Sequence, residues 1–101
     1  MKVSIITITY NAENTIFNSL NSVFSQSHKN IEHIIIDGGS KDNTLKTCKA
    51  FPHISKIVSE PDKGVYDAFN KGLKLATGDI VGFLNADDEF YSEKAVEDIV
   101  N

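Results

Sequence analysis

The sequence has a single cysteine, Cys48, and it has no arginine, since all ten basic residues are lysines scattered along the chain. One cysteine cannot form an intrachain disulfide, so nothing in the composition suggests an oxidising compartment. The formal net charge is −4, and no block of basic residues stands out. A primary nucleic-acid-binding protein usually carries a basic stripe, so we expect no nucleic acid among the partners.

Membrane and targeting signals are also missing from the 101 residues. No basic–apolar–small signal peptide opens the chain, and no apolar run approaches the roughly 20 residues needed to span a bilayer. We therefore expect a cytoplasmic protein, with peripheral membrane contact open only for parts of a longer protein. The chain also lacks linkers, low-complexity tracts and internal repeats, so we expect one domain over residues 1–101.

The chain does have a regular alternation of strand and helix patterns. Runs rich in β-branched and apolar residues predict strands at Val3–Thr9, Ile31–Ile36, Ile54–Val58 and Ile80–Leu84. Capping residues and helical spacing predict helices after Asn11 and Asn14, after Ser40, from Val65 to Ala76, and after Ser92. This alternation predicts right-handed crossovers and a parallel sheet covered by helices on both faces.

One helix has the clearest amphipathic pattern in the sequence. We expect its apolar residues to face the sheet; they are Val65, Ala68, Phe69, Gly72, Leu73 and Ala76. The three histidines, in contrast, have no mutual spacing typical of a metal site, so we expect surface or strand-face roles for them.

Polar residues follow every predicted strand. The four strand ends are Thr9-Tyr10-Asn11, Asp37-Gly38-Gly39-Ser40, Ser59 to Gly64, and Asn85-Ala86-Asp87-Asp88. Turns favour Gly, Asn, Asp and Pro, which explains the residue types singly but explains less well why three of the ends carry an acid. Ligands of open α/β sheets bind outside the carboxyl ends of the strands, so these ends predict the functional site.

The adjacent carboxylates Asp87 and Asp88 point to a metal. They follow a buried strand, where two like charges repel each other and are costly to desolvate, and a hard divalent cation such as Mg²⁺ or Mn²⁺ relieves that cost. An acidic turn without a ligand is the alternative for this stretch alone. Neither G-x-G-x-x-G nor G-x-x-x-x-G-K-[ST] is present, so a diphosphate would need a metal, helped by Lys63 or a helix N-terminus.

Five segments, in order, resemble the amino-terminal half of a family 2 glycosyltransferase with the GT-A fold. They are Val3 to Asn11, Ile36 to Thr44, Ser59 to Gly64, Ala68 to Gly72, and Gly78 to Asp88. The resemblance covers essentially the whole chain. It implies a Rossmann-like three-layer α/β/α fold of the nucleotide-diphospho-sugar transferase type, with a mainly parallel sheet, truncated because the acceptor-binding half is absent.

The resemblance also implies site residues. Those expected to bind the nucleotide are Thr9, Tyr10, Asn11, Asp37, Asp62, Lys63, Asn85 and Ala86. Thr9 and Tyr10 would border the base and ribose, and Asp37 would accept a hydrogen bond from the base, typically uracil. Asp87 and Asp88 would bind the metal. Two positions depart from the family: Asn85 replaces the first Asp of Asp-x-Asp, and Phe69 stands where Arg is common.

The resemblance implies inverting transfer of a sugar from a nucleotide-diphosphate sugar to an acceptor hydroxyl, with a UDP-linked donor expected and with Mg or Mn as cofactor. The acceptor would be a carbohydrate or a lipid-linked molecule, as in polysaccharide biosynthesis for the cell envelope. The general base is expected beyond Asn101, so we expect this chain to bind nucleotide without transferring sugar. Two alternatives stay open: a metal-dependent phosphotransfer or phosphohydrolase domain, although Asn85 stands where its nucleophile would be, and a non-catalytic binding module.

Two structural expectations follow from a shared site. Asp37 and Asp87 reach one nucleotide only if the strands lie in the spatial order 3-2-1-4, with the first and fourth adjacent. The strand Ile80–Leu84 would then form a sheet edge that has no Pro or Lys to block pairing. We therefore expect self-association through this edge.

Overall fold

The computed structural model describes residues 1–101, in which four strands alternate with four helices. The elements are β1 (Val3–Thr9), α1 (Ile16–Phe24), β2 (Ile31–Asp37), α2 (Thr44–Ala50), β3 (Ile54–Ser59), α3 (Val65–Leu75), β4 (Ile80–Phe83) and α4 (Ala95–Val100). Every strand lies within one residue of its predicted range. None of the helices has the length and apolar content needed to span a bilayer.

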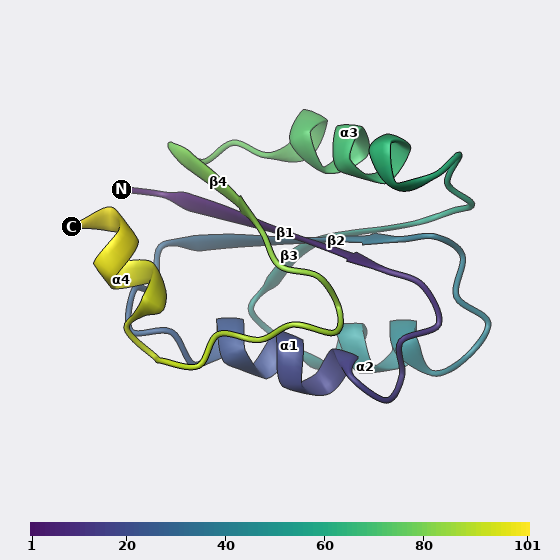
Figure 1. Ribbon diagram of the computed structural model, residues 1–101, viewed down its shortest axis with the longest axis horizontal. Coiled ribbons are helices and arrows are strands. Elements are labelled where there is room, and N and C mark those ends of the chain that lie inside the picture. Colours follow the sequence, from purple (N-terminus) through teal and green to yellow (C-terminus); the bar gives the residue numbers. More distant parts are fainter.

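The strands form one parallel sheet in the order β3-β2-β1-β4, which confirms the predicted topology. The register pairs Thr9 of β1 with Asp37 of β2, and Asp37 with Ser59 of β3. Because parallel strands end at the same edge, this pairing brings three of the polar strand ends into one row. Both termini lie at the opposite end of the sheet (Figure 1).

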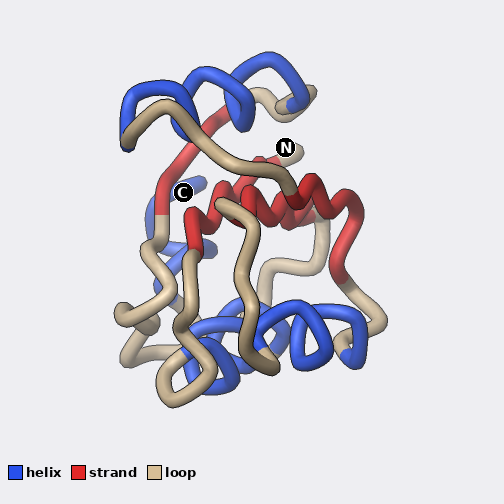
Figure 2. The backbone as a smooth tube through the Cα atoms, turned by 90° about the vertical axis from the view of Figure 1, so that its right-hand side faces the viewer, coloured by secondary structure: helices blue, strands red, loops and turns tan.

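The helices cover both faces of the sheet, as predicted. In Figure 1, α3 lies on one face, while α1 and α2 lie on the other, and Figure 2 shows the same three layers from the side. Successive side chains along a strand point to opposite faces of the sheet, so the strands supply apolar residues to the helices on both faces. Ile6, Ile34 and Ile36 pack against Ala68 of α3, whereas Ile35 packs against α1 and α2 in a cluster with Ile16, Leu20 and Cys48.

Helix α3 lies unusually close to β1. A Cβ atom added to Gly72 would be 2.6 Å from Cγ2 of Ile6, so only glycine permits this approach. The expectation that the whole apolar face of α3 points to the sheet was wrong for Val65 and Leu73, which are 60% and 48% exposed. The reason is that β4, with its four residues, is the edge strand, and no further strand lies beside it to cover this flank.

Glu32 links β1 to the segment between α3 and β4 at the amino end of the sheet. Its buried carboxylate accepts hydrogen bonds from Ser4 Oγ (2.8 Å) and from both the backbone N–H and the hydroxyl of Thr77 (2.8 and 3.0 Å). Burial alone would raise the pKa of Glu32, but these hydrogen bonds, together with the charge of Lys2, lower it to about 2. The charged carboxylate thus holds the connection between α3 and β4 to the first residues of β1.

The buried His33 contacts the half-buried His53, a pairing that the spacing of the histidines did not reveal. His33 is fully buried on β2, with Nε2 2.8 Å from Thr7 Oγ1 and Nδ1 2.9 Å from His53 Nε2. The ring of His53 also packs against Phe24 and Phe51. Burial, and then the neighbouring His53, lowers the pKa of His33 to about 3, so His33 is neutral in the folded protein. Burial also lowers the pKa of His53.

This pair predicts a loss of stability at mildly acidic pH. Below about pH 6.5 the unfolded chain takes up a proton on residue 33 while the folded chain does not, so the free energy of unfolding falls by about 1.4 kcal/mol per pH unit. Between pH 7.5 and pH 5, urea unfolding should show a loss of about 2 kcal/mol from His33. The variant His33→Gln should lose most of this dependence, and an unchanged slope in that variant would contradict the assignment.

Candidate functional site

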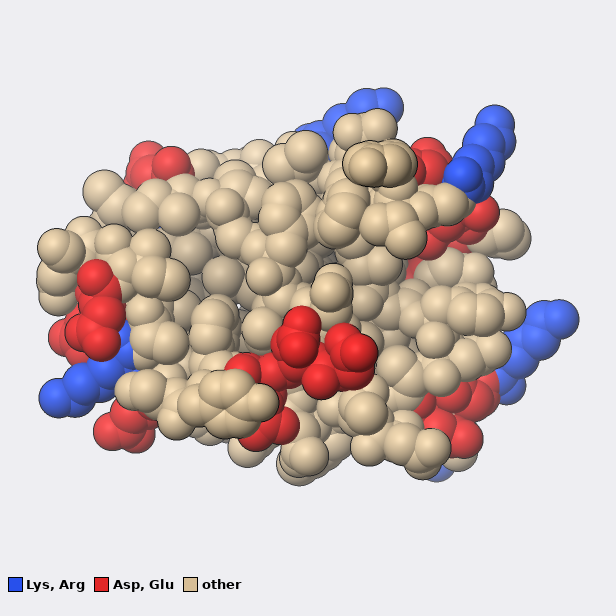
Figure 3. Space-filling model, in the orientation of Figure 1, with Lys and Arg blue, Asp and Glu red and all other residues tan.

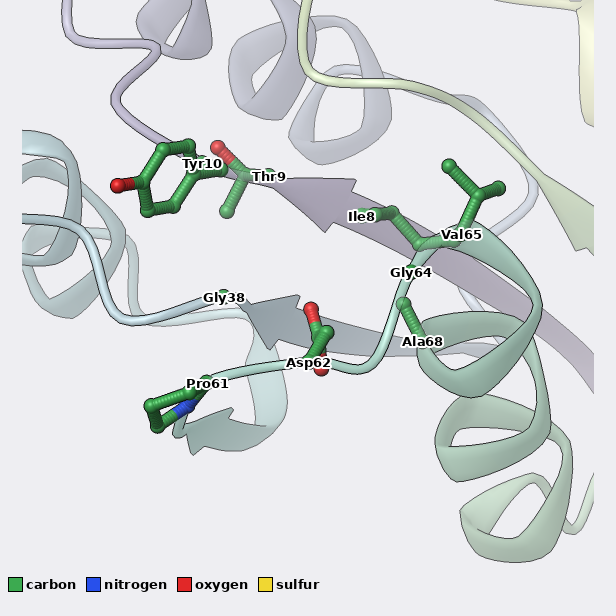
Figure 4. A pocket seen from close by; sticks show the side chains of 9 residues that line it. All are labelled: Ile8, Thr9, Tyr10, Gly38, Pro61, Asp62, Gly64, Val65 and Ala68. Atoms are coloured by element: carbon green, nitrogen blue, oxygen red, sulfur yellow. The ribbon is translucent and has the colours of Figure 1, made fainter.

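Three adjacent hollows, which share lining residues, follow the carboxyl edge of the sheet, and together we call them the groove. The Tyr10 hollow (about 410 Å³) is lined by Ile8, Thr9, Tyr10, Gly38, Pro61, Asp62, Gly64, Val65 and Ala68 (Figure 4). The Asp87 hollow (about 390 Å³) shares Ile8, Tyr10 and Val65 with it and adds Ala12, Phe69, Asn85, Ala86 and Asp87. The Asp88 hollow (about 440 Å³) continues past Phe69 and Asn85 to Tyr66, Asn70, Leu73, Phe83 and Asp88. The groove therefore runs from Asp62 to Asp88.

Asp37 organises the loop after β2. It is fully buried, and its Oδ2 accepts hydrogen bonds from the N–H groups of Gly39 (3.1 Å) and Ser40 (2.9 Å) and from Ser59 Oγ (2.7 Å). Its Oδ1 accepts the hydroxyl of Ser40. Both oxygens are thus bound by the protein itself, and Asp37 does not line the groove. A hydrogen bond from a base to Asp37 stays a prediction, and the observed role of this carboxylate is structural.

Ser40 links this loop to the end of β1. Its hydroxyl oxygen accepts the N–H of Asn11 (2.8 Å), and the side-chain oxygen of Asn11 accepts the N–H of Lys41 (2.9 Å). Asn11 adopts a left-handed backbone with φ of 46°, which Asn tolerates better than most residues. Ser40 was expected to cap α2, but this was wrong, because the helix starts after Asn43 and the Ser40 side chain is engaged with Asp37.

Thr9 and Tyr10 meet the groove in different ways. Thr9 is buried, and its hydroxyl has no hydrogen-bond partner and points away from Asp62 (Figure 4). Its backbone oxygen accepts the N–H of Gly38 (2.9 Å), so Thr9 contributes to the wall of the hollow and offers a ligand little to bind. Tyr10 is 59% exposed and lines both the Tyr10 hollow and the Asp87 hollow. An exposed aromatic ring at this position can stack on a flat ligand.

The loop between β3 and α3 is held by one lysine. Lys71 Nζ lies 2.6 Å from Asp62 Oδ1, 3.2 Å from Glu60 Oε1 and 3.5 Å from Asp67 Oδ2. The hydrogen bond to Asp62, followed by that to Glu60, raises the pKa of Lys71, so it stays charged. Lys71 was not among the predicted site residues; its i,i+4 spacing from Asp67 was the available signal. Lys63 was predicted to bind the nucleotide, but it is exposed and lines none of the three hollows.

The loop after β4 presents its carboxylates to solvent. Ala86 is buried in the cluster beneath α1, and Ser19 Oγ donates to the backbone oxygen of Asn85 (3.1 Å), so the loop is anchored from below. Asp87 and Asp88 are exposed and line adjacent hollows. Figure 3 shows acidic side chains gathered near the middle of this face, where the loop after β4 crosses it in Figure 1.

The donor set at Asp87 and Asp88 suits a partly substrate-bound metal. No group of three or more His, Cys, Asp or Glu side chains is placed to hold a metal ion by protein ligands alone. Mg²⁺ is commonly bound through one or two carboxylates and completed by substrate phosphates and water. Two exposed carboxylates beside an open groove fit that pattern.

The role of Asp37 predicts a large effect on stability. Asp37→Ala leaves two backbone N–H groups and two hydroxyls without their acceptor, so the free energy of unfolding should fall by about 3 kcal/mol or more. Asp88→Ala, which removes an exposed carboxylate, should cost less than about 0.5 kcal/mol. Urea unfolding of both variants measures the difference, and an Asp37→Ala variant as stable as Asp88→Ala would show that Asp37 is free for a ligand instead.

Comparison with known proteins identifies the chain's relatives. The family model described as glycosyl transferase family 2 matches residues 4–101. An uncharacterized glycosyltransferase of Mycobacterium tuberculosis is 40% identical over 102 residues, which cover 97% of this chain and 38% of that protein. A PGL/p-HBAD biosynthesis glycosyltransferase of Mycobacterium bovis is 40% identical, covering 87% of this chain and 36% of the relative. The chain thus spans less than two fifths of these relatives.

Solved structures agree with the sequence comparison. Residues 1–349 of S. aureus TarS in complex with UDP-GlcNAc match 99% of this chain and 30% of that one, with 29% identity and a TM-score of 0.89. The mannosyltransferase PcManGT of Pyrobaculum calidifontis, in complex with GDP-Man and Mn²⁺, matches 98% of this chain and 31% of that one, with 26% identity and a TM-score of 0.88. These likenesses confirm the expected GT-A type of α/β fold. With the family model matching nearly every residue, the chain belongs to glycosyl transferase family 2.

Proposed function

We propose that this chain forms the nucleotide-sugar-binding part of an enzyme that transfers a sugar from a nucleoside diphosphate to an acceptor hydroxyl with inversion. The observation that carries the proposal is the row of adjacent hollows at the carboxyl edge of the sheet, with the exposed ring of Tyr10 near one end and the neighbouring carboxylates of Asp87 and Asp88 toward the other. Family membership favours glycosyl transfer over the phosphotransfer alternative. The similar structures of TarS with UDP-GlcNAc and of PcManGT with GDP-Man support a nucleotide sugar as the ligand.

The groove divides naturally along such a ligand. The Tyr10 hollow is mainly apolar and suits a base, whereas the Asp87 hollow lies where a diphosphate could meet a metal. Between them stands Val65, the first residue of α3, whose amino end has no side-chain cap. Free N–H groups and the helix dipole at such an end favour phosphate. The Asp88 hollow, with Tyr66 and Asn70 at its wall, is then left for the sugar.

Asp87 and Asp88 would hold the divalent cation. The Mn²⁺ in the similar PcManGT complex supports this choice of metal. When bound, the metal would stabilise the negative charge that develops on the departing diphosphate. Asn85 contributes a neutral amide where the family pattern has a carboxylate, so Asp87 and Asp88 would supply the protein charge at this end.

Transfer needs further groups. The acceptor hydroxyl must lose its proton to a general base, and we propose that this base and the pocket for a carbohydrate or lipid-linked acceptor belong to polypeptide beyond Asn101. The chain by itself then positions the donor and excludes water from one side of it. Peripheral membrane contact would likewise belong to the longer protein, and we keep the cytoplasm as the proposed compartment.

Binding without transfer is the direct test. The chain should bind UDP or GDP in the presence of Mn²⁺, and Asp87→Ala should abolish the dependence on metal while Asp98→Ala, an exposed acid in α4, should not. Calorimetric titrations with and without EDTA measure both effects. The diphosphate would be held from one side and stay wet, where charge interactions are weaker, so affinity should be modest. Metal-independent binding that survives Asp87→Ala, or sugar transfer by this chain alone, would contradict the proposal.

The edge strand predicts self-association of the isolated chain. β4 pairs only with β1, and Val81 and Phe83 are 38% and 46% exposed. Phe83 also lines the Asp88 hollow together with Leu73. An unpaired, apolar strand edge favours pairing with another chain. Light scattering at high concentration should detect dimers or larger species, and Val81→Lys should reduce them. A clean monomer for the unmodified chain would refute this expectation.

A further inference from the structure

We propose that Asp62 reads the base: its carboxylate selects nucleotides whose base offers a ring N–H, uracil or guanine, over cytosine and adenine. The inference rests on the proposed function, because it assigns the specificity of the same groove. It transfers to Asp62 the role that the sequence resemblance gave to Asp37. Three features of the Tyr10 hollow carry it.

The first feature is a carboxylate oxygen that the protein leaves free. The Asp62 side chain is only 14% exposed, and its Oδ1 is held by Lys71 Nζ at 2.6 Å. Its Oδ2 accepts no hydrogen bond from any other residue. In Asp37, by contrast, both carboxylate oxygens accept hydrogen bonds from the protein. Figure 4 shows one Asp62 oxygen directed toward the space between the strand ends and α3. The hollow is lined by no other acidic side chain.

The second feature is the missing side chain at Gly38. A Cβ atom built on Gly38 would lie 3.0 Å from Asp62 Oδ2 and 3.4 Å from Cδ1 of Tyr10. Any larger residue would therefore stand between the aromatic ring and the free oxygen. Glycine keeps this space open, so a planar group that contacts Tyr10 can bring its edge to Asp62.

The third feature is the position of Asp62 along the groove. Asp87 lines the neighbouring hollow, and Asp88 lines the one beyond it, so Asp62 lies at the end away from the proposed metal. A diphosphate would avoid an acid that has no metal beside it. The base is the part of a nucleotide farthest from the diphosphate, and the apolar wall of Ile8, Val65 and Ala68 suits its flat surface.

The chemistry of a carboxylate decides which bases fit. A carboxylate paired with a lysine, as Asp62 is with Lys71 at 2.6 Å, accepts hydrogen bonds and donates none. Uracil and guanine present a ring N–H at their pairing edge, whereas cytosine and adenine present a ring nitrogen lone pair there. A ring N–H forms a charge-assisted hydrogen bond with the carboxylate, whereas a ring lone pair faces it as a second acceptor and is repelled. Uracil and guanine nucleotides should therefore bind roughly 10- to 100-fold more tightly than cytosine and adenine nucleotides.

The variant Asp62→Asn tests the assignment by changing the selectivity. Lys71 only donates hydrogen bonds, so it should hold the amide oxygen and turn the NH₂ group toward the hollow, where it can donate to cytosine. Titrations of UDP, GDP, CDP and ADP with Mn²⁺ should show wild type preferring UDP or GDP over CDP and ADP by about tenfold or more. Asp62→Asn should lose or reverse that preference, and Glu60→Gln, the matched change on an exposed partner of Lys71, should keep it.

A second variant tests the same oxygen without changing charge. Gly38→Ala places its Cβ against Asp62 Oδ2 and should reduce the preference for UDP or GDP over CDP, with circular dichroism confirming that each variant is folded. If wild type binds no nucleotide at all, the proposed function fails, and this inference fails with it. If wild type binds but Asp62→Asn weakens all four nucleotides equally, Asp62 contacts the ribose instead, and only the inference is overturned. Equal binding of CDP and UDP by wild type also overturns it.

Discussion

The buried carboxylate of Asp37 is the interaction on which the geometry of the groove depends. It stands at the end of β2, in the middle of the row formed by the ends of β1, β2 and β3, and its four hydrogen bonds fix the Gly39–Ser40 turn and reach Ser59 on β3. Through Ser40 the same network reaches Asn11. One buried charge thereby holds three connections in fixed relative positions. A buried charge is costly unless it is fully hydrogen-bonded, which is why the surrounding loop supplies so many donors.

The two ends of the groove are built differently. At the Tyr10 end, Asp62 is tied to Lys71 and Gly38 leaves a defined space, so this end is formed before any ligand arrives. At the other end, Asp87 and Asp88 stand on an anchored but open turn, with an Asp88 N–H to Asn85 oxygen hydrogen bond of 3.0 Å closing it. Preformed contacts suit recognition of a rigid base, and open carboxylates suit a metal whose remaining ligands come from the substrate.

The sequence predicted the strands, their order and the edge of the sheet where the groove lies, because these follow from apolar periodicity and from the rules of parallel crossovers. The individual roles at the site were harder to predict. That Asp37 is bound by its own loop, or that Lys71 reaches back nine positions to Asp62, depends on hydrogen bonds across turns that no periodic pattern records. The helix cap assigned to Ser40 failed for the same reason, since a tertiary partner competed for its hydroxyl. The pairing of His33 with His53 depends on the register of β2 and β3, which sequence spacing alone does not give.

The contact between Gly72 and Ile6 sets how closely α3 packs on the sheet. The middle of this helix rests directly on the side chain of Ile6, because Gly72 has no side chain of its own, while Val65, two turns away, forms part of the wall of two hollows. A bulkier residue at position 72 would push α3 away from the sheet. Because the helix moves as a rigid unit, Val65 at its start would move too, and the Tyr10 and Asp87 hollows would both change shape. The width of the groove is thus set in part from a point that no ligand in the groove would contact.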